Sequence, residues 1–151
     1  MNRGLALLLA AALAGPAWGL SRQPPKQPER KTPLMEWKGT FCAVTTPAYR
    51  IITTQKEWNA LWAQIGQSAP AVDFKAYFAL AVFLGARNTG GYSVSFQDPV
   101  DETAAMALAY KINSPAPDTM TMQVLTQPYA VRLYPKKNKP IKVSAPLALK
   151  P

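Results

Sequence analysis

The chain has 151 residues, 48% of them hydrophobic, which suits one globular domain with a modest core. It carries 17 Lys and Arg residues against 8 Asp and Glu residues, so its net charge is +9, and it contains no histidine. Without histidine, Ser-His-Asp triads, imidazole bases and histidine metal sites are excluded, and a single cysteine excludes an internal disulfide and a zinc thiolate cluster. We therefore expect no metal and no cofactor.

Residues 1–19 have the pattern of a cleaved secretory signal peptide. A basic residue precedes an apolar run over 5–14, which is too short to span a bilayer, and small residues stand before an expected cleavage after Gly19. The residue directly after that position is leucine rather than cysteine, so no lipobox is expected. Residues 20–33 are rich in proline and polar residues and predict a disordered linker. The sequence thus predicts a protein that is secreted, or held in the periplasm or cell envelope.

The folded domain is expected over 34–144, with a tail over 145–151. One helix is predicted at about 55–65. Thr54 and Glu57 have the spacing of a capping box, and Gly66 stands where a left-handed helix cap is preferred. Four large apolar residues between these signals share one helical face: Trp58, Leu61, Trp62 and Ile65. We expect this face to cover a sheet rather than to bind a ligand.

Short apolar or alternating segments separated by turn residues predict about six to eight strands. They fall at 36–45, 49–53, 78–84, 92–96, 106–112, 120–124, 129–133 and 141–144. Because no helix separates the later strands, the sheet should be mainly antiparallel. The predicted fold is a single α+β domain, a mainly antiparallel sheet with one covering helix.

The organising stretch is predicted to be a β-hairpin at the centre of this sheet. The unbroken apolar run over 78–84 is typical of a strand buried on both faces, and the alternation over 92–96 of a strand buried on one. Two adjacent glycines between them suit a reversal with positive φ. The loop and a neighbouring bend supply the candidate binding residues, namely Arg87, Asn88, Thr89, Gly90, Gly91, Tyr92, Gln127, Pro128 and Tyr129.

The sequence offers little for catalysis. Cys42 lies in an apolar run and is expected to be a buried, inert thiol. A hydrolase would need a pocket in which Asp73, Arg87 and Ser93 converge. The basic residues are spread along the chain, which suits contact with an anionic envelope surface and gives no nucleic-acid signature. We therefore expect a non-enzymatic protein with a protein partner and no nucleic acid.

Several linked pieces of the chain resemble the C-terminal domain of the PrcB family. They are V-D-F at 72–74, F-L-G-A-R-N-T-G-G-Y-S-V at 83–94, P-A-P-D at 115–118 and Q-V-L-T-Q-P-Y at 123–129. The likeness runs from about Tyr49 to Val143 and includes the E-W-x-x-L-W helix. It implies a small α+β domain on an exported protein that supports a secreted protease complex, without catalytic residues. The family is often lipid-anchored, and this chain lacks the cysteine for that.

A second likeness is confined to one loop. The N-T-G-G-Y turn over 88–92 is similar to the T-G-Y loop of chagasin-type cysteine protease inhibitors. Two alternatives to the accessory role therefore stay open: a protease inhibitor that presents Asn88–Tyr92, and a binder of envelope polyanions.

Overall fold

The computed structural model describes residues 35–145. The expected signal peptide and linker, and all but the first residue of the expected tail, lie outside the described residues. Eight strands and one helix make up the described part. They are β1 (Glu36–Gly39), β2 (Ala48–Ile52), α1 (Gln55–Ile65), β3 (Tyr77–Phe83), β4 (Ser93–Phe96), β5 (Val100–Asp101), β6 (Met106–Asn113), β7 (Tyr129–Pro135) and β8 (Ile141–Ser144).

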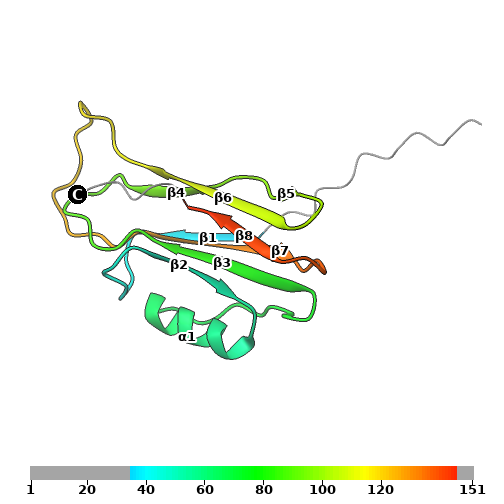
Figure 1. Ribbon diagram of the computed structural model, residues 1–151. Helices are drawn as coiled ribbons and strands as arrows, with labels where there is room; N and C mark the ends of the chain where they lie inside the picture. Colours follow the sequence, from blue (N-terminus) through cyan, green and yellow to red (C-terminus); the bar gives the residue numbers. More distant parts are fainter. Residues whose placement is uncertain (1–34, 146–151) are drawn as a thin grey trace, which may run out of the picture. The chain divides into compact units, whose positions relative to one another are not determined.

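The strands form two sheets that face one another (Figure 1). The first sheet has the order β1-β7-β3-β2 and is antiparallel throughout. In the second, β6 pairs with β4 and β5 in antiparallel fashion and with β8 in parallel. The α+β class, the single helix and the mainly antiparallel strands are confirmed, but the strands are divided between two sheets.

The helix begins and ends where its sequence signals predict. The Thr54 side chain accepts a hydrogen bond from the Glu57 amide at 3.3 Å, and the Glu57 carboxylate accepts from the Thr54 amide at 3.2 Å. Gly66 ends the helix with φ of 79°, in the left-handed region. These caps satisfy main-chain groups that the helix itself leaves unpaired.

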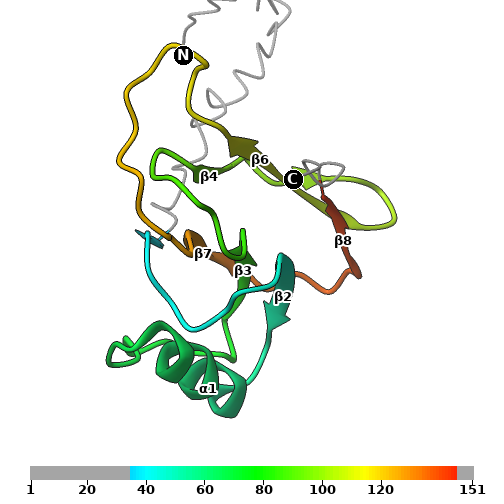
Figure 2. The same ribbon diagram turned by 90° about the vertical axis from the view of Figure 1, so that its left-hand side faces the viewer.

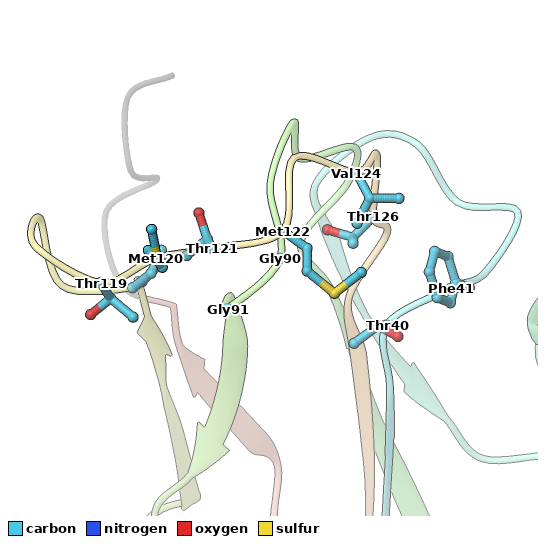
Figure 3. Close-up of a pocket in the computed structure, with 11 residues that line it drawn as sticks. Thr40, Phe41, Gly90, Gly91, Thr119, Met120, Thr121, Met122, Val124 and Thr126 are labelled. Atoms are coloured by element: carbon cyan, nitrogen blue, oxygen red, sulfur yellow. The ribbon is translucent and has the colours of Figure 1, made fainter.

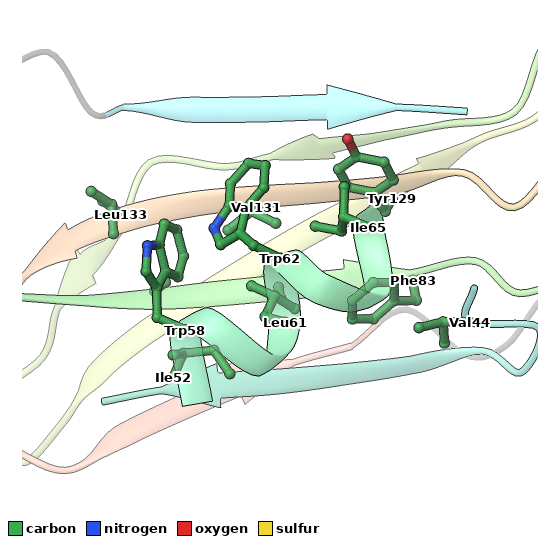
Figure 4. Close-up of a cluster of buried hydrophobic side chains, with 12 residues drawn as sticks. Val44, Ile52, Trp58, Leu61, Trp62, Ile65, Phe83, Tyr129, Val131 and Leu133 are labelled. Atoms are coloured by element: carbon green, nitrogen blue, oxygen red, sulfur yellow. The ribbon is translucent and has the colours of Figure 1, made fainter. Parts of the chain in front are cut away.

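One core cluster lies between α1 and the first sheet (Figure 4). Trp58 and Trp62 are fully buried, and each packs edge-to-face against Trp37 of β1 with ring centroids less than 6 Å apart, at 5.6 and 5.7 Å. The Trp58 indole N–H donates to the Pro70 carbonyl at 2.8 Å, so this buried polar group is satisfied. The tryptophans are core residues, as predicted.

The second core cluster lies between the two sheets. Alternate residues of β3 enter it, including Phe78, Leu80 and Val82, while Ala79 and Ala81 face the helix. Burial on both faces explains why β3 reads as an unbroken apolar run. The prediction of a central strand is confirmed.

Arg132 of β7 connects the two sheets by polar contacts. Its side chain lies 3.8 Å from the Glu36 carboxylate on β1 and 3.5 Å from the Asp98 carboxylate after β4. It also donates to the Gln97 carbonyl at 3.2 Å. A mostly buried guanidinium is tolerated at this position because charges and hydrogen bonds surround it.

The predicted hairpin is wrong. β3 pairs with β2 and β7, whereas β4 pairs with β6 in the other sheet. The intervening segment therefore crosses from one sheet to the other (Figure 2). The two strands are neighbours face to face rather than edge to edge, since Val94 of β4 packs in the same cluster as Leu80 of β3.

Two predicted strands are also corrected. The alternating residues 120–124 form no strand, because they project beyond the sheets and meet no partner strand. The first strand ends at Gly39 instead of reaching Thr45, and Phe41 is left 59% exposed.

Candidate functional site

Three segments meet at one end of the first sheet: 40–47, 84–92 and 115–128. Arg87 and Thr126 exchange both main-chain hydrogen bonds at 2.8 Å. Leu84 donates to the Pro128 carbonyl at 2.9 Å, and Gln127 donates to the Thr40 carbonyl at 2.8 Å. The candidate loop and the candidate bend, which are distant in sequence, are thus side by side.

The loop over 87–92 is held in place by its neighbours. The Gly90 amide donates to the Met122 carbonyl at 3.0 Å, and the Thr126 hydroxyl donates to the Thr89 carbonyl at 3.0 Å. Gly91 has φ of 87°, and a Cβ there would lie 3.0 Å from the Pro115 side chain. A loop with this many internal contacts is shaped before any partner arrives.

The candidate binding residues differ in exposure. Asn88 and Gly91 are exposed, Arg87, Thr89, Gly90, Tyr92 and Gln127 are half-buried, and Pro128 and Tyr129 are buried. Tyr129 belongs to the core between α1 and the first sheet. The loop therefore presents a surface, while Pro128 and Tyr129 support it from below.

An apolar groove of about 490 Å³ opens beside the loop (Figure 3). Its walls come from residues 40–41, 90–91, 115, 119–122, 124 and 126. The only polar side-chain groups among them are threonine hydroxyls, and none of the lining residues is charged. We call this feature the apolar groove.

Large exposed side chains surround the groove. Met120 is fully exposed, Met122 is 77% exposed, and Phe41 is 59% exposed. Figure 3 shows the Met122 side chain extending between Gly90 and Phe41. Methionine side chains are flexible and polarisable, and they adapt to apolar partners of differing shape. Sequence reasoning missed these residues because it assigned them to strands, although M-T-M next to a proline-rich bend was a visible signal.

A second cavity, of about 190 Å³, lies on the other side of the loop. Arg87 lines it together with Tyr49 of β2 and Tyr110 of β6, over a floor that includes Val82 and Leu84. The Arg87 guanidinium carbon lies 5.2 Å from the Tyr92 ring centroid, a cation–π contact. We call this feature the arginine cavity.

The residues considered for catalysis do not assemble. Asp73 accepts a hydrogen bond from the Lys75 amide at 2.9 Å in the turn before β3, whereas Arg87 follows the far end of that strand. A strand of seven residues separates them by roughly 20 Å. Burial raises the pKa of the half-buried Cys42 thiol, so the unreactive protonated form is favoured.

Within 35–145, no three His, Cys, Asp or Glu residues are grouped so as to hold a metal ion. Over the same range, no helix has the length and apolar character required to cross a membrane.

The structure defines a class: a small α+β domain in which a helix and a second sheet cover opposite faces of one antiparallel sheet, with a braced loop between two cavities at one end. Sequence comparison then adds one finding. Residues 78–132 match the family model described as PrcB C-terminal, which confirms the resemblance over this segment. The match starts in β3, ends in β7 and contains the loop; β1, β2, α1 and β8 lie outside it. No curated protein and no solved structure matches the chain.

Proposed function

We propose that this chain is an exported, non-enzymatic binding domain that holds a polypeptide partner in the apolar groove. The observation that carries the proposal is the uncharged groove itself, with exposed Met120, Met122 and Phe41 around it. Exposed apolar surface of this kind is unfavourable in water unless a partner covers it, and it marks interaction sites on other proteins.

The main chain beside the groove favours a polypeptide over a small molecule. The N–H groups of Thr121, Gln123 and Leu125 donate to no other residue within 35–145. An extended peptide could pair with these groups while its side chains enter the groove, as in strand addition. The family match supports a subunit of a secreted protease complex as the partner, because the PrcB resemblance implies such a role.

Export rests on the signal-peptide pattern over 1–19. The non-enzymatic role rests on the neutral Cys42 thiol and on the separation of Asp73 from Arg87.

The test is site-specific photocrosslinking in the producing cell. A benzophenone side chain at Met122 is expected to crosslink one defined secreted polypeptide, and the same group at Met35 is expected not to. Met35 is a matched control because it is also an exposed methionine, at 60%, and it lies at the opposite end of β1 from Phe41. A synthetic peptide of the crosslinked segment should then bind the wild-type chain and Met35→Glu but not Met120→Glu/Met122→Glu. Equal crosslinking from both positions, or equal peptide binding by both variants, contradicts the proposal.

A protease inhibitor is a second candidate, favoured by the bracing of the loop. The bonds from Gly90 to Met122 and from Thr126 to Thr89 fix the loop around exposed Asn88, and inhibitors gain affinity from such preorganisation. Assays against cysteine and metalloproteases distinguish the two roles. If the chain fails to inhibit these proteases at micromolar concentration, the inhibitor role is ruled out.

The polyanion-binding alternative has weaker support. Lys137 and Lys139 lie 2.6 and 2.7 Å from the two Asp101 carboxylate oxygens, so the basic cluster at this turn is partly neutralised.

A further inference from the structure

Arg87 is the cationic residue of the loop, and its guanidinium lacks a polar partner in the described structure. No hydrogen bond or ion pair joins its side chain to any residue within 35–145, and its Nε atom is shielded from solvent and unsatisfied. Leaving a donor unsatisfied in a shielded position is unfavourable by the desolvation of that group. The other arginines of the described chain, Arg50 and Arg132, each donate to an oxygen acceptor through a terminal nitrogen, although the Nε atom of Arg132 is also shielded and unsatisfied.

The Arg87 main chain is fixed on both sides. Its amide and carbonyl both bond to Thr126, and its guanidinium stacks on the Tyr92 ring. A side chain positioned in this way loses little further freedom when it accepts a ligand. The unsatisfied group is therefore presented by a rigid support rather than by a mobile surface residue.

The arginine cavity supplies complementary groups. Tyr49 and Tyr110 line it from β2 and β6, and their phenol groups can donate hydrogen bonds. A phenol is protonated at neutral pH in any case, and burial raises the pKa of Tyr110 further. Val82, Leu84 and Ile112 complete an apolar wall.

We infer that the arginine cavity binds a carboxylate group that carries a short apolar substituent. The planar guanidinium offers two parallel donors that match the two oxygens of a carboxylate. A volume of about 190 Å³ accommodates a small acid or one chain end, and not a large cofactor. The cavity has one cationic side chain, Arg87, and an apolar wall, which suit a singly charged acid better than a doubly charged phosphate.

The source of the carboxylate is either a free small acid or the C-terminus of a polypeptide. The site is separate from the apolar groove, since the two cavities share no lining residue. The inference therefore does not depend on the proposed function.

The experiment is an NMR titration in which isovalerate is added to the ¹⁵N-labelled chain. The main-chain amide resonances are recorded at each concentration. Saturable shifts are expected at Arg87, Tyr49 and Tyr110. Isovaleramide, which has the same shape without the charge, and inorganic phosphate should each bind at least tenfold more weakly. Peptides ending in leucine, with free or amidated C-termini, distinguish the two sources. A chain-end site predicts tighter binding of the free-acid peptide than of isovalerate, whereas a small-acid site predicts the reverse.

Variants assign the effect. Arg87→Gln should weaken isovalerate binding at least tenfold, and Arg87→Lys should restore part of it. Tyr110→Phe removes one donor without changing the ring and should weaken binding severalfold, which tests the site even if Arg87 variants fold poorly. Arg50→Gln is the matched control, because Arg50 also lies over an aromatic ring but on the helix side, where it is bonded to Gln64. Binding by Arg50→Gln and by Met122→Glu should be unchanged. Absence of saturable shifts, equal binding of phosphate, or full binding by both Arg87→Gln and Tyr110→Phe overturns the inference.

Discussion

The hydroxyl of Thr126 donates a hydrogen bond to the carbonyl oxygen of Thr89, with 3.0 Å between the two oxygens. Thr126 is 2% exposed and is the buried polar residue of the described chain. The bond joins the segment before β7 to the loop between the two cavities. Because it is shielded from water, it should contribute to the shape of that loop more than a surface bond would.

Thr126→Val should test this contribution. The substitution keeps the side-chain volume but leaves the Thr89 carbonyl without its donor, and it should lower the free energy of unfolding by about 1 kcal/mol. Urea denaturation measures that change, and faster hydrogen exchange of the Gly90 amide would show that the loop has loosened. Thr119→Val is the control, since Thr119 is exposed. If both variants are as stable as the wild type, the bond does not hold the loop.

Two glycines with positive φ allow steric and conformational effects to be separated. Gly85 has φ of 72°, and a Cβ there would lie 2.7 Å from the Thr45 carbonyl oxygen and 2.8 Å from Pro47. Gly66 has φ of 79°, and nothing lies within 4 Å of the corresponding position. Gly66→Ala should therefore be destabilising by about 1 kcal/mol, the cost of a left-handed alanine. Gly85→Ala should lower the free energy of unfolding clearly more, as measured by thermal or urea denaturation. Equal losses of stability in the two variants would mean that the 84–86 main chain moves freely.

The carboxyl group of Asp101 should make the free energy of unfolding depend on pH under acidic conditions. Hydrogen bonds from Lys137 and Lys139 lower the pKa of its carboxyl from 3.8 to about 2. A carboxyl group whose folded pKa is lowered stabilises the protein above its unfolded pKa, and this stabilisation is lost as the pH falls toward the folded value. Asp101→Asn should thus flatten the decline in stability between about pH 4 and pH 2, as should Lys137→Gln/Lys139→Gln. Denaturant midpoints across this range check it, and an unaltered slope in Asp101→Asn would refute it.

The hydroxyl group of Tyr134 should make the free energy of unfolding fall as the pH rises under alkaline conditions. It is fully buried against Phe78, and burial raises its pKa from 10 to about 12, with Arg132 offsetting part of the effect. Because the unfolded chain loses this proton first, the stabilisation is complete below pH 10 and is lost as the pH rises to about 12. Tyr134→Phe keeps the ring and should reduce this alkaline loss by roughly 1–2 kcal/mol. A variant that unfolds along the wild-type pH curve would argue against a buried phenol.

Local signals in the sequence predicted the local structure. Thr54, Glu57 and Gly66 placed both ends of α1, because capping depends on residues a few positions apart. The apolar run over 78–84 identified β3 as a central strand, because burial on both faces removes alternation.

Long-range pairing was not predictable from the same signals. Alternation shows which side chains face inward, and it does not show which sheet a strand joins, so β3 and β4 read as a hairpin. The loop was singled out as a candidate binding surface, yet the apolar groove beside Gly90 and Gly91 is completed by Phe41 and by residues 119–122 and 124, far away in sequence. Met120 and Met122 alternate like strand residues but meet no strand, and only the folded chain reveals this.

The place of β7 bears on how the chain can be made. β7 is the hydrogen-bonded neighbour of both β1 and β3. β1 is synthesised before the other strands, and it cannot pair in the sheet until β7, near the end of the chain, has been made. Until Tyr129–Pro135 is synthesised, the sheet against which the α1 tryptophans pack lacks one of its two inner strands. The first sheet therefore depends on contacts between residues far apart in sequence, and such contacts slow folding relative to local ones.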